Sequence, residues 1–269
     1  MGETEPLVTD ALWHGVLTGT QPMLRRGRGV FMRLPGDVRC KLCAAPFGGA
    51  AGSVMRLLGK GPWASNPRYC RSCFAFLIRH RGGAEIDCTL VFADVRGSTS
   101  MAERMRPAEV HELMDRFFRA AARVLVEHDA IVDRFVGDQT IGIFVPALSG
   151  ADHAARGVDA ARALLAATGH GEREPWIPIG VGVHSGVAFV GCVGSESHVD
   201  LTALGDTVNI AARLASAAGP GELLVTDDAA RAAHLDSAGF DRRELALKGR
   251  TAPITVLAMR GLAAAEIPP

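Results

Sequence analysis

The sequence predicts an α+β fold, with a mixed and mainly antiparallel sheet covered by helices, preceded by a small metal-binding module. Three observations indicate this. From about residue 86 onward, strand-like and helix-like runs alternate. Several strand-like runs are joined by tight glycine-containing links, which suit hairpins rather than long crossovers. Four of the six cysteines form two CxxC pairs ahead of residue 86.

The first predicted elements of the larger part are a strand, a long helix and a hairpin. Residues 88–95 (CTLVFADV) form a short apolar run typical of a buried strand. From Pro107 to about residue 125, apolar residues recur with the 3.6-residue period of a helix. Two strand-like runs in 131–145 flank Gly137-Asp138. Glycine tolerates the positive φ that a tight turn needs, so this link predicts a hairpin.

Further elements follow in the second half of the chain. We expect helices over residues 151–167 and 206–217. The runs 177–186 (IPIGVGVHSG) and 187–194 (VAFVGCVG) are interpreted as a pair of strands. A strand, a short helix and two final strands complete the prediction, and residues 7–17 predict a short helix at the N-terminus.

Charge is balanced over the whole chain and uneven along it. The 29 basic and 29 acidic residues give no net charge, so the chain as a whole has no electrostatic attraction to nucleic acid or to a membrane, and we expect no nucleic-acid partner. No uncharged apolar run reaches the length of a transmembrane helix, and the N-terminus lacks the pattern of a signal peptide, so we expect a cytoplasmic protein. Residues 1–85 hold 12 Lys or Arg against 5 Asp or Glu. We therefore predict a basic N-terminal module over 1–85, with a linker at 79–85, a domain over 86–260 and a tail over 261–269.

The four paired cysteines indicate a metal site in the basic module. Cys40 and Cys43 form one CxxC pair, and Cys70 and Cys73 form the other. Two such pairs supply four thiolates, which is the ligand set of structural Zn²⁺ sites. An iron–sulfur cluster uses the same ligands, and redox-active thiols are a third reading. The sequence favours zinc and leaves the other two open.

Two aspartates are candidates for a catalytic metal site. Asp94 ends a predicted strand and Asp138 lies in a predicted hairpin turn. Together with the carbonyl of Val95, they offer the hard oxygen ligands that Mg²⁺ or Mn²⁺ prefers, and two such ions support phosphoryl chemistry. Taken alone, each aspartate is also a common turn or cap residue. The nearby Arg96 and Ser98 either assist phosphate binding or serve the turn alone.

A second candidate set lies on the predicted helix 206–217. Asn209 and Arg213 are four residues apart, so their side chains project from one helix face. An amide beside a guanidinium suits ribose and phosphate oxygens. A solvated helix face is the plainer alternative.

Five segments, in order, resemble the catalytic domain of class III nucleotide cyclases, the adenylyl and guanylyl cyclases. The resemblance covers about residues 86–260. The segments are FADVRGST (92–99), FVGDQTIGIF (135–144), GVGVHSG (180–186), DLTALGDTVNIAARL (200–214) and LKGRTAPITVL (247–257).

This resemblance implies a ferredoxin-like core that works as a head-to-tail homodimer with two active sites at the interface. Asp94 and Asp138 of one protomer would hold two Mg²⁺ or Mn²⁺ ions. Asn209 and Arg213 of the partner subunit would orient the ribose and stabilise the transition state. Lys248 would contact the phosphates of a nucleoside triphosphate. The implied reaction converts ATP to 3′,5′-cyclic AMP and pyrophosphate.

Base selection rests, by the same resemblance, on Arg134 and Thr202. Adenylyl cyclases usually have Lys at the first position and Asp or Thr at the second. Arginine is a longer, forked donor that also suits guanine, so a guanylate cyclase is an alternative. We favour ATP because a donor-only pair matches the acceptors of adenine. A non-catalytic, nucleotide-sensing dimerisation module is a further alternative, and the cysteine module is expected to brace the dimer or to report metal or redox state.

Overall fold

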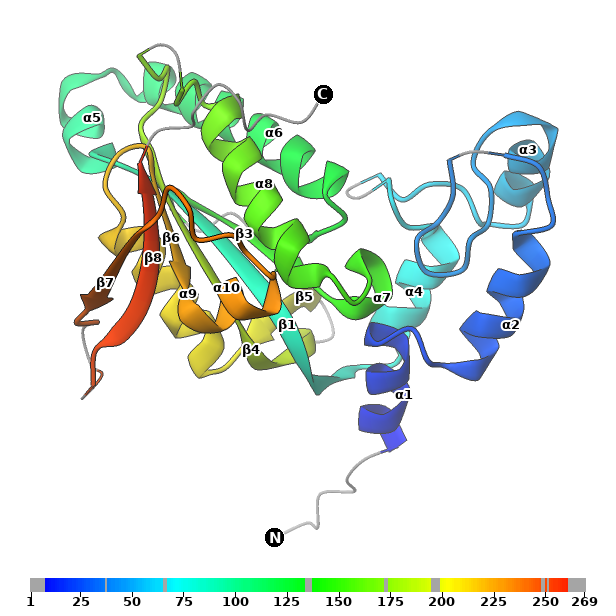
Figure 1. The fold of residues 1–269 in the computed structure, drawn as a ribbon. Coiled ribbons are helices and arrows are strands. Elements are labelled where there is room, and N and C mark those ends of the chain that lie inside the picture. Colours follow the sequence, from blue (N-terminus) through cyan, green and yellow to red (C-terminus); the bar gives the residue numbers. More distant parts are fainter. Residues whose placement is uncertain are drawn as a thin grey trace, which may run out of the picture. The chain divides into compact units, whose positions relative to one another are not determined.

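The computed structural model describes residues 8–36, 38–64, 67–133, 137–171, 174–194, 199–247, 250 and 252–260 (Figure 1). These residues form two compact units. The first unit draws on the ranges 1–86, 145–151 and 188–204. The second unit draws on 87–144, 152–187 and 205–269.

The first unit is mainly helical. It contains α1 (Val8–Leu17), α2 (Pro22–Phe31), α3 (Gly49–Leu57), α4 (Arg71–Arg79), α7 (Pro146–Ser149), the start of β1 (Gly82–Val95), the end of β4 (Ile179–Gly194) and β5 (Val199–Leu204). Trp13 of α1 is buried, and its indole nitrogen donates to the carbonyl of His80 just after α4. This contact ties the first helix of the unit to the last helix before the sheet.

The second unit alternates helices and strands. Besides the remaining parts of β1 and β4, it contains α5 (Ser98–Arg104), α6 (Pro107–Glu127), β2 (Ile131–Val132), β3 (Gln139–Phe144), α8 (His153–Ala167), α9 (Asp206–Ala217), β6 (Glu222–Thr226), α10 (Asp227–Ala232), β7 (Asp241–Leu245) and β8 (Ile254–Arg260). The predicted helices 107–125, 151–167 and 206–217 correspond to α6, α8 and α9.

The strands follow the order β2-β3-β1-β4-β6-β8-β7, and β5 pairs with β4. The pairs β1–β3, β2–β3, β4–β5, β6–β8 and β7–β8 are antiparallel, whereas β4 and β6 are parallel. The prediction of an α+β fold with a mainly antiparallel sheet is therefore confirmed.

Helices cover both faces of this sheet in the second unit. Leu223 and Val225 of β6 pack in the core with α6 and α8, whereas Leu224 between them packs with α9. This alternation follows from the two-residue period of a strand. The stripe predicted for α6 is also buried, since Phe117 and Leu125 are fully covered.

Some element predictions were wrong in detail. The runs 177–186 and 187–194 form one strand, β4, rather than a pair. Gly186 at their junction is not among the glycines with positive φ, so no turn forms there. The expected linker 79–85 is mostly regular structure, because α4 ends at Arg79 and β1 begins at Gly82. Helices α2, α3, α4, α5 and α7 were not predicted. The glycines within or beside α2, α3 and α5 obscured the periodicity.

None of the helices in the described part of the chain combines the length and the apolar character needed to cross a bilayer.

Candidate active site

Backbone pairing between β1 and β3 brings the two predicted metal aspartates together. Asp94, the second-last residue of β1, is opposite Gln139, the first residue of β3. The amide of Val95 donates to the carbonyl of Asp138 at 3.2 Å. Asp138 therefore lies directly beside the end of β1, on the turn before β3. The Asp94 side chain is nearly buried and that of Asp138 is half-buried.

Both carboxylates have partners from the segment that follows β1. The Arg96 guanidinium forms an ion pair with Asp94, and the Ser98 hydroxyl hydrogen-bonds to the Asp138 carboxylate. Arg96 also donates to the carbonyl of Ser216 at the end of α9, at 2.8 Å. Burial lowers the pKa of Arg96, and the negative charge of Asp138 opposes that shift. Sequence reasoning noted Arg96 and Ser98 but did not connect them to these two carboxylates.

The donor set fits a divalent cation. Two adjacent carboxylates provide the oxygen ligands and the negative charge that Mg²⁺ or Mn²⁺ requires. The Val95 amide donates to the Asp138 carbonyl, so it is not available to a ligand. That the Val95 carbonyl binds a metal stays a prediction. A cation at Asp94 has to compete with or replace the guanidinium of Arg96, since that group already neutralises the carboxylate. The site is therefore able to hold a metal after a local side-chain change.

A cavity of about 510 Å³ adjoins Asp138. Its walls come from α5, α6 and the turn before β3, and include Ser98, Met101, Val110 and Gly137. Most of the lining is apolar, and its polar side chains are those of Ser98, Thr99 and Asp138. This cavity leaves space beside Asp138.

Helix α9 presents the second candidate pair. Asn209 is exposed and Arg213 is half-buried, whereas Ile210 and Leu214 of the same helix are buried. The helix begins after Gly205, whose φ of 130° suits glycine, and Arg250 pairs with Asp206 in the first turn. In the described part of the chain, no hydrogen bond or ion pair links Asn209 or Arg213 to Asp94 or Asp138.

Three predicted substrate-binding residues remain, and the structure describes only Thr202 among them. Thr202 is buried in β5, opposite Gly191 of β4. Arg134 and Lys248 lie outside the described residues. Their predicted contacts with the base and the phosphates stay predictions.

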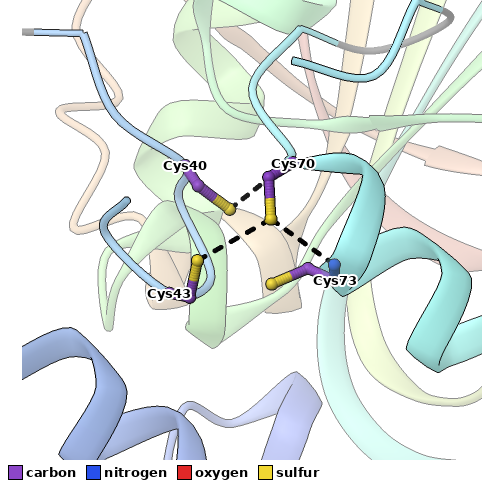
Figure 2. Close-up of side chains that lie close together, drawn as sticks. All are labelled: Cys40, Cys43, Cys70 and Cys73. Atoms are coloured by element: carbon purple, nitrogen blue, oxygen red, sulfur yellow. Dashed lines mark hydrogen bonds between the residues drawn. The ribbon is translucent and has the colours of Figure 1, made fainter. Parts of the chain in front are cut away.

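The four paired cysteines converge in the first unit (Figure 2). Cys40, Cys43, Cys70 and Cys73 are all buried, and their sulfur atoms lie within 4.8 Å of one another. The Sγ atoms of Cys43 and Cys70 are 3.8 Å apart, much longer than the ~2.05 Å of a disulfide. This cluster is a group that could hold a metal ion.

Backbone amides support the sulfur atoms. The amide of Cys70 donates to Cys40 Sγ at 3.3 Å, and that of Cys73 donates to Cys70 Sγ at 3.4 Å (Figure 2). Cys70 is the N-cap of α4, where the helix dipole stabilises negative charge. Hydrogen bonds within the cluster, first that with Cys43, hold the pKa of Cys40 well below its usual range, whereas the hydrogen bonds with Cys40 and Cys43 raise the pKa of Cys70 and of Cys73. The neighbouring thiols thus stabilise a thiolate at Cys40, and the thiolate is the form of cysteine that binds metals.

Comparison with known proteins agrees with this geometry. The family model of the adenylate and guanylate cyclase catalytic domain matches residues 84–259. The chain is 30% identical over 131 residues to an adenylate cyclase of Anabaena cylindrica, and 32% over 134 residues to adenylate cyclase 1 of Rhizobium meliloti. These matches cover 47% and 48% of this chain but only 26% and 20% of the relatives. The chain thus spans about a quarter or less of these curated relatives.

Solved structures show the same fold. The guanylyl cyclase Cya2 superimposes with a TM-score of 0.61 and 26% identity, over 69% of this chain and 97% of that chain. The adenylyl cyclase CyaB from P. aeruginosa gives a TM-score of 0.58 and 23% identity, over 68% and 97%. The matched family range contains Asp94, Asp138 and all of α9. The chain belongs to the family of adenylate and guanylate cyclase catalytic domains, the class III nucleotide cyclases.

Proposed function

We propose that this chain is an adenylate cyclase, which converts ATP to 3′,5′-cyclic AMP and pyrophosphate at sites shared between two copies of the chain. The observation that supports it most is the contact between the ends of β1 and β3, where the Val95 amide meets the Asp138 carbonyl at 3.2 Å. This contact brings the backbone of Asp138 beside the end of β1, next to Asp94, and Asp138 lines a cavity. Such a pair of aspartates serves two-metal phosphoryl chemistry.

The residues of the chain have distinct parts in this reaction. Asp94, Asp138 and the carbonyl of Val95 would hold Mg²⁺ or Mn²⁺. When bound, these ions lower the pKa of the attacking ribose hydroxyl and offset the charge that develops on the phosphate. The Asn209 amide orients the ribose, and the Arg213 guanidinium binds the phosphate oxygens as their charge grows. Bond formation from the 3′-oxygen to the α-phosphorus then releases pyrophosphate.

The exposure of the α9 face supports a shared site. Asn209 is exposed. Among the described residues, neither Asn209 nor Arg213 forms a hydrogen bond or an ion pair with Asp94 or Asp138. A head-to-tail dimer would supply each metal pair with an Asn–Arg pair from the partner subunit. A single chain then holds two incomplete halves and is inactive.

The choice of ATP rests on donor chemistry and on two relatives. Thr202 and Arg134 offer hydrogen-bond donors for the acceptor nitrogens of adenine. The two curated relatives described above are named adenylate cyclases. Cya2, at 26% identity, is a guanylyl cyclase, so GTP is the competing substrate that the assay has to include.

Cyclic nucleotide production by the purified chain tests the proposal. With Mn²⁺ present, we expect cyclic AMP from ATP and much less cyclic GMP from GTP. Asp94→Asn should abolish the product, whereas Asp87→Asn on the same strand should not, since the Asp87 side chain is 66% exposed. Cyclic GMP as the main product would overturn the substrate. No product from a folded, dimeric chain would favour a nucleotide-sensing module.

Mixing two inactive variants tests the shared site. Asp94→Asn removes a metal ligand, and Asn209→Ala removes the group assigned to the opposite half. In a mixed dimer, one site carries both changes and the other carries neither. We expect about a quarter of the normal activity from an equal mixture, because about half of the dimers are mixed and each has one intact site. Two inactive variants that stay inactive when mixed would place all four residues in one chain.

We also propose that the four-cysteine cluster binds one structural Zn²⁺. In a tetrahedral site with Zn–S bonds of about 2.3 Å, neighbouring sulfur atoms are about 3.8 Å apart. The Cys43–Cys70 separation of 3.8 Å matches this edge, and every sulfur pair lies within 4.8 Å. In an iron–sulfur cluster the cysteines bind different irons separated by sulfide, so the sulfur atoms cannot all lie this close. The spacing therefore favours a single ion.

Elemental analysis of the purified chain tests the zinc site. We expect one zinc per chain, lost in Cys43→Ser and retained in Cys192→Ser, whose thiol lies outside the cluster and donates to the Leu77 carbonyl. Because a small metal module gains folding free energy from the ion, the zinc-free variant should also lose helical signal. Iron with inorganic sulfide, or a metal-free chain with a disulfide, would contradict the proposal.

A further inference from the structure

The first unit has an unusual surface composition. Between residues 11 and 84 the sequence holds 12 Lys or Arg and a single acidic residue, Asp37. Four thiolates with one Zn²⁺ would subtract two charges and leave the stretch strongly basic. Among the described residues, the structure exposes nine large apolar side chains, and seven of these lie between residues 23 and 58. Basic and exposed apolar side chains are therefore concentrated in the same part of the chain.

These side chains gather on α2 and α3. No residue of α2 is buried, and α2 has no acidic residue in its first turn. Met23 and Val30, seven residues apart on one face of α2, are 69% and 60% exposed. Leu57, the last residue of α3, is 89% exposed. The α2–α3 surface is defined here as Met23, Val30, Val54, Leu57 and Leu58 with Arg25, Arg26, Arg56 and Lys60.

Lys60 joins the two halves of this surface. It follows α3 closely, and its ammonium group lies 5.3 Å from the ring centroid of Phe31 at the end of α2. A cavity of about 240 Å³ lies at this junction, lined by Met23, Leu24, Phe31 and Lys60 among others. Lys60, three residues after the end of α3, therefore places a cation at the edge of an apolar hollow that α2 borders through Met23, Leu24 and Phe31.

The chemistry of this surface matches an anionic bilayer. Exposed aliphatic side chains beside arginines are typical of segments that lie in the lipid interface, where the apolar groups enter the acyl boundary and the cations meet phosphate headgroups. Binding to single-stranded nucleic acid would instead use exposed aromatic side chains as stacking platforms. None of the nine large apolar side chains exposed in the described residues is aromatic.

We propose that the α2–α3 surface docks this chain on the surface of an anionic lipid bilayer. The exposed leucines of α3 and the apolar face of α2 insert shallowly, and the arginines of α2 bind lipid phosphates. The proposal does not depend on the substrate of the cyclase. It places a chain without a described membrane-spanning helix at a membrane surface.

Vesicle co-sedimentation with the full chain tests the docking. We expect binding to vesicles of phosphatidylcholine with about one-third phosphatidylglycerol, weak binding to phosphatidylcholine alone, and weaker binding at about 0.5 M salt than at 0.1 M. Leu57→Ser with Leu58→Ser should weaken binding at least tenfold, and both side chains are exposed enough for the fold to tolerate the change. Val187→Ser, which removes an apolar side chain of the second unit that is 60% exposed, is the control and should bind normally.

A pair of charge-reversal substitutions distinguishes binding to anionic lipid from nonspecific adsorption to vesicles. Arg25→Glu with Arg26→Glu should weaken binding to anionic vesicles by about 25-fold or more, since each cation near such a surface contributes about fivefold. Arg119→Glu, on an exposed face of α6, should leave vesicle binding unchanged. Zinc content and circular dichroism of each variant show that the module is folded.

Four results would overturn the proposal. These are no binding to anionic vesicles, equal binding to neutral and anionic vesicles, unchanged binding by both pairs of variants, and a gel shift with nucleic acid in place of vesicle binding. A change of oligomeric state in the leucine variant, without vesicle binding by the normal chain, would instead assign the surface to a second copy. None of these readouts uses cyclase activity.

Discussion

The close approach of α9 to β4 leads to a sharp prediction about Gly182. A side-chain carbon built on Gly182 would lie 2.5 Å from the amide nitrogen of Ala215, 2.6 Å from Leu214 Cβ and 2.8 Å from the Ala211 carbonyl oxygen. All three atoms belong to α9, and two of them are backbone atoms that no side-chain rotation can move. Gly182→Ala therefore has to push α9 off the strand (Figure 1).

The structure sets the size of this effect. Ordinary contacts begin at 3.4 Å, so the helix must shift by about 0.9 Å. Overpacking of this kind costs about 1–3 kcal/mol, which corresponds to a fall in Tm of roughly 2–12 °C for a domain of this size. Because Asn209 and Arg213 lie on the same helix, a displacement of about 1 Å should also lower kcat by about 10²-fold.

Thermal unfolding and cyclase assays on Gly182→Ala test this reasoning, with Gly186→Ala as the matched control. Gly186 is on the same strand and face, but its added carbon would meet the Thr207 side chain at 3.3 Å and 3.5 Å, where a small adjustment suffices. We expect the control to keep its Tm within a few degrees and most of its activity. A Gly182→Ala variant with normal Tm and kcat would refute the close packing of α9 on β4.

Two further predictions concern buried titratable groups of the second unit. Burial raises the pKa of Glu222, but the Gly219 amide and the guanidinium groups of Arg260 and Arg243 outweigh it, so the pKa lies below the ordinary value. Glu222→Gln should therefore lower the free energy of unfolding by about 1–3 kcal/mol at pH 7. This loss should shrink as the pH falls below about 4.5, where the carboxylate becomes protonated, and urea titrations at pH 7 and below pH 4.5 measure it. A loss that does not depend on pH would contradict an ionic contribution of Glu222. Burial also lowers the pKa of His153 and His184 below 6.5. The neutral histidines therefore contribute their full stability above pH 6.5, and this contribution is lost as the pH falls below 6.5, because the unfolded chain then binds protons more readily than the folded one. His184→Asn should accordingly make Tm fall less between pH 6.5 and pH 5. An equal fall of Tm in this variant and in the normal chain would contradict the prediction.

Much of the candidate site was predictable because its signals are local. The apolar run that ends at Asp94 predicts a strand with a carboxylate at its end, and Gly137 next to Asp138 predicts a turn. The spacing of Asn209 and Arg213 places them on one face of α9. The CxxC spacing of Cys40 with Cys43, and of Cys70 with Cys73, likewise indicates a metal site without knowledge of the fold. Each of these signals spans only a few residues.

Other features depend on contacts that no local pattern records. The register between β1 and β3 decides that Asp138 meets Val95, and the packing of α9 decides that Arg96 reaches Ser216 as well as Asp94. The continuity of β4 through Gly186 depends on backbone φ values that glycine leaves open. Sequence periodicity does not report such choices, since they are made by the energy of the whole sheet.

The sequence by itself determined the α+β class, the strand-end position of Asp94, the turn position of Asp138, the shared helix face of Asn209 and Arg213, and the pairing of the four cysteines. The tertiary structure alone decided that the sulfur atoms converge within 4.8 Å across a 26-residue spacer, and that the leucines at the end of α3 stay exposed. A leucine in a sequence is expected to be buried, and only the packing around it shows whether another element covers it. Local patterns specify which groups the chain carries, whereas their distances and exposure arise from long-range packing.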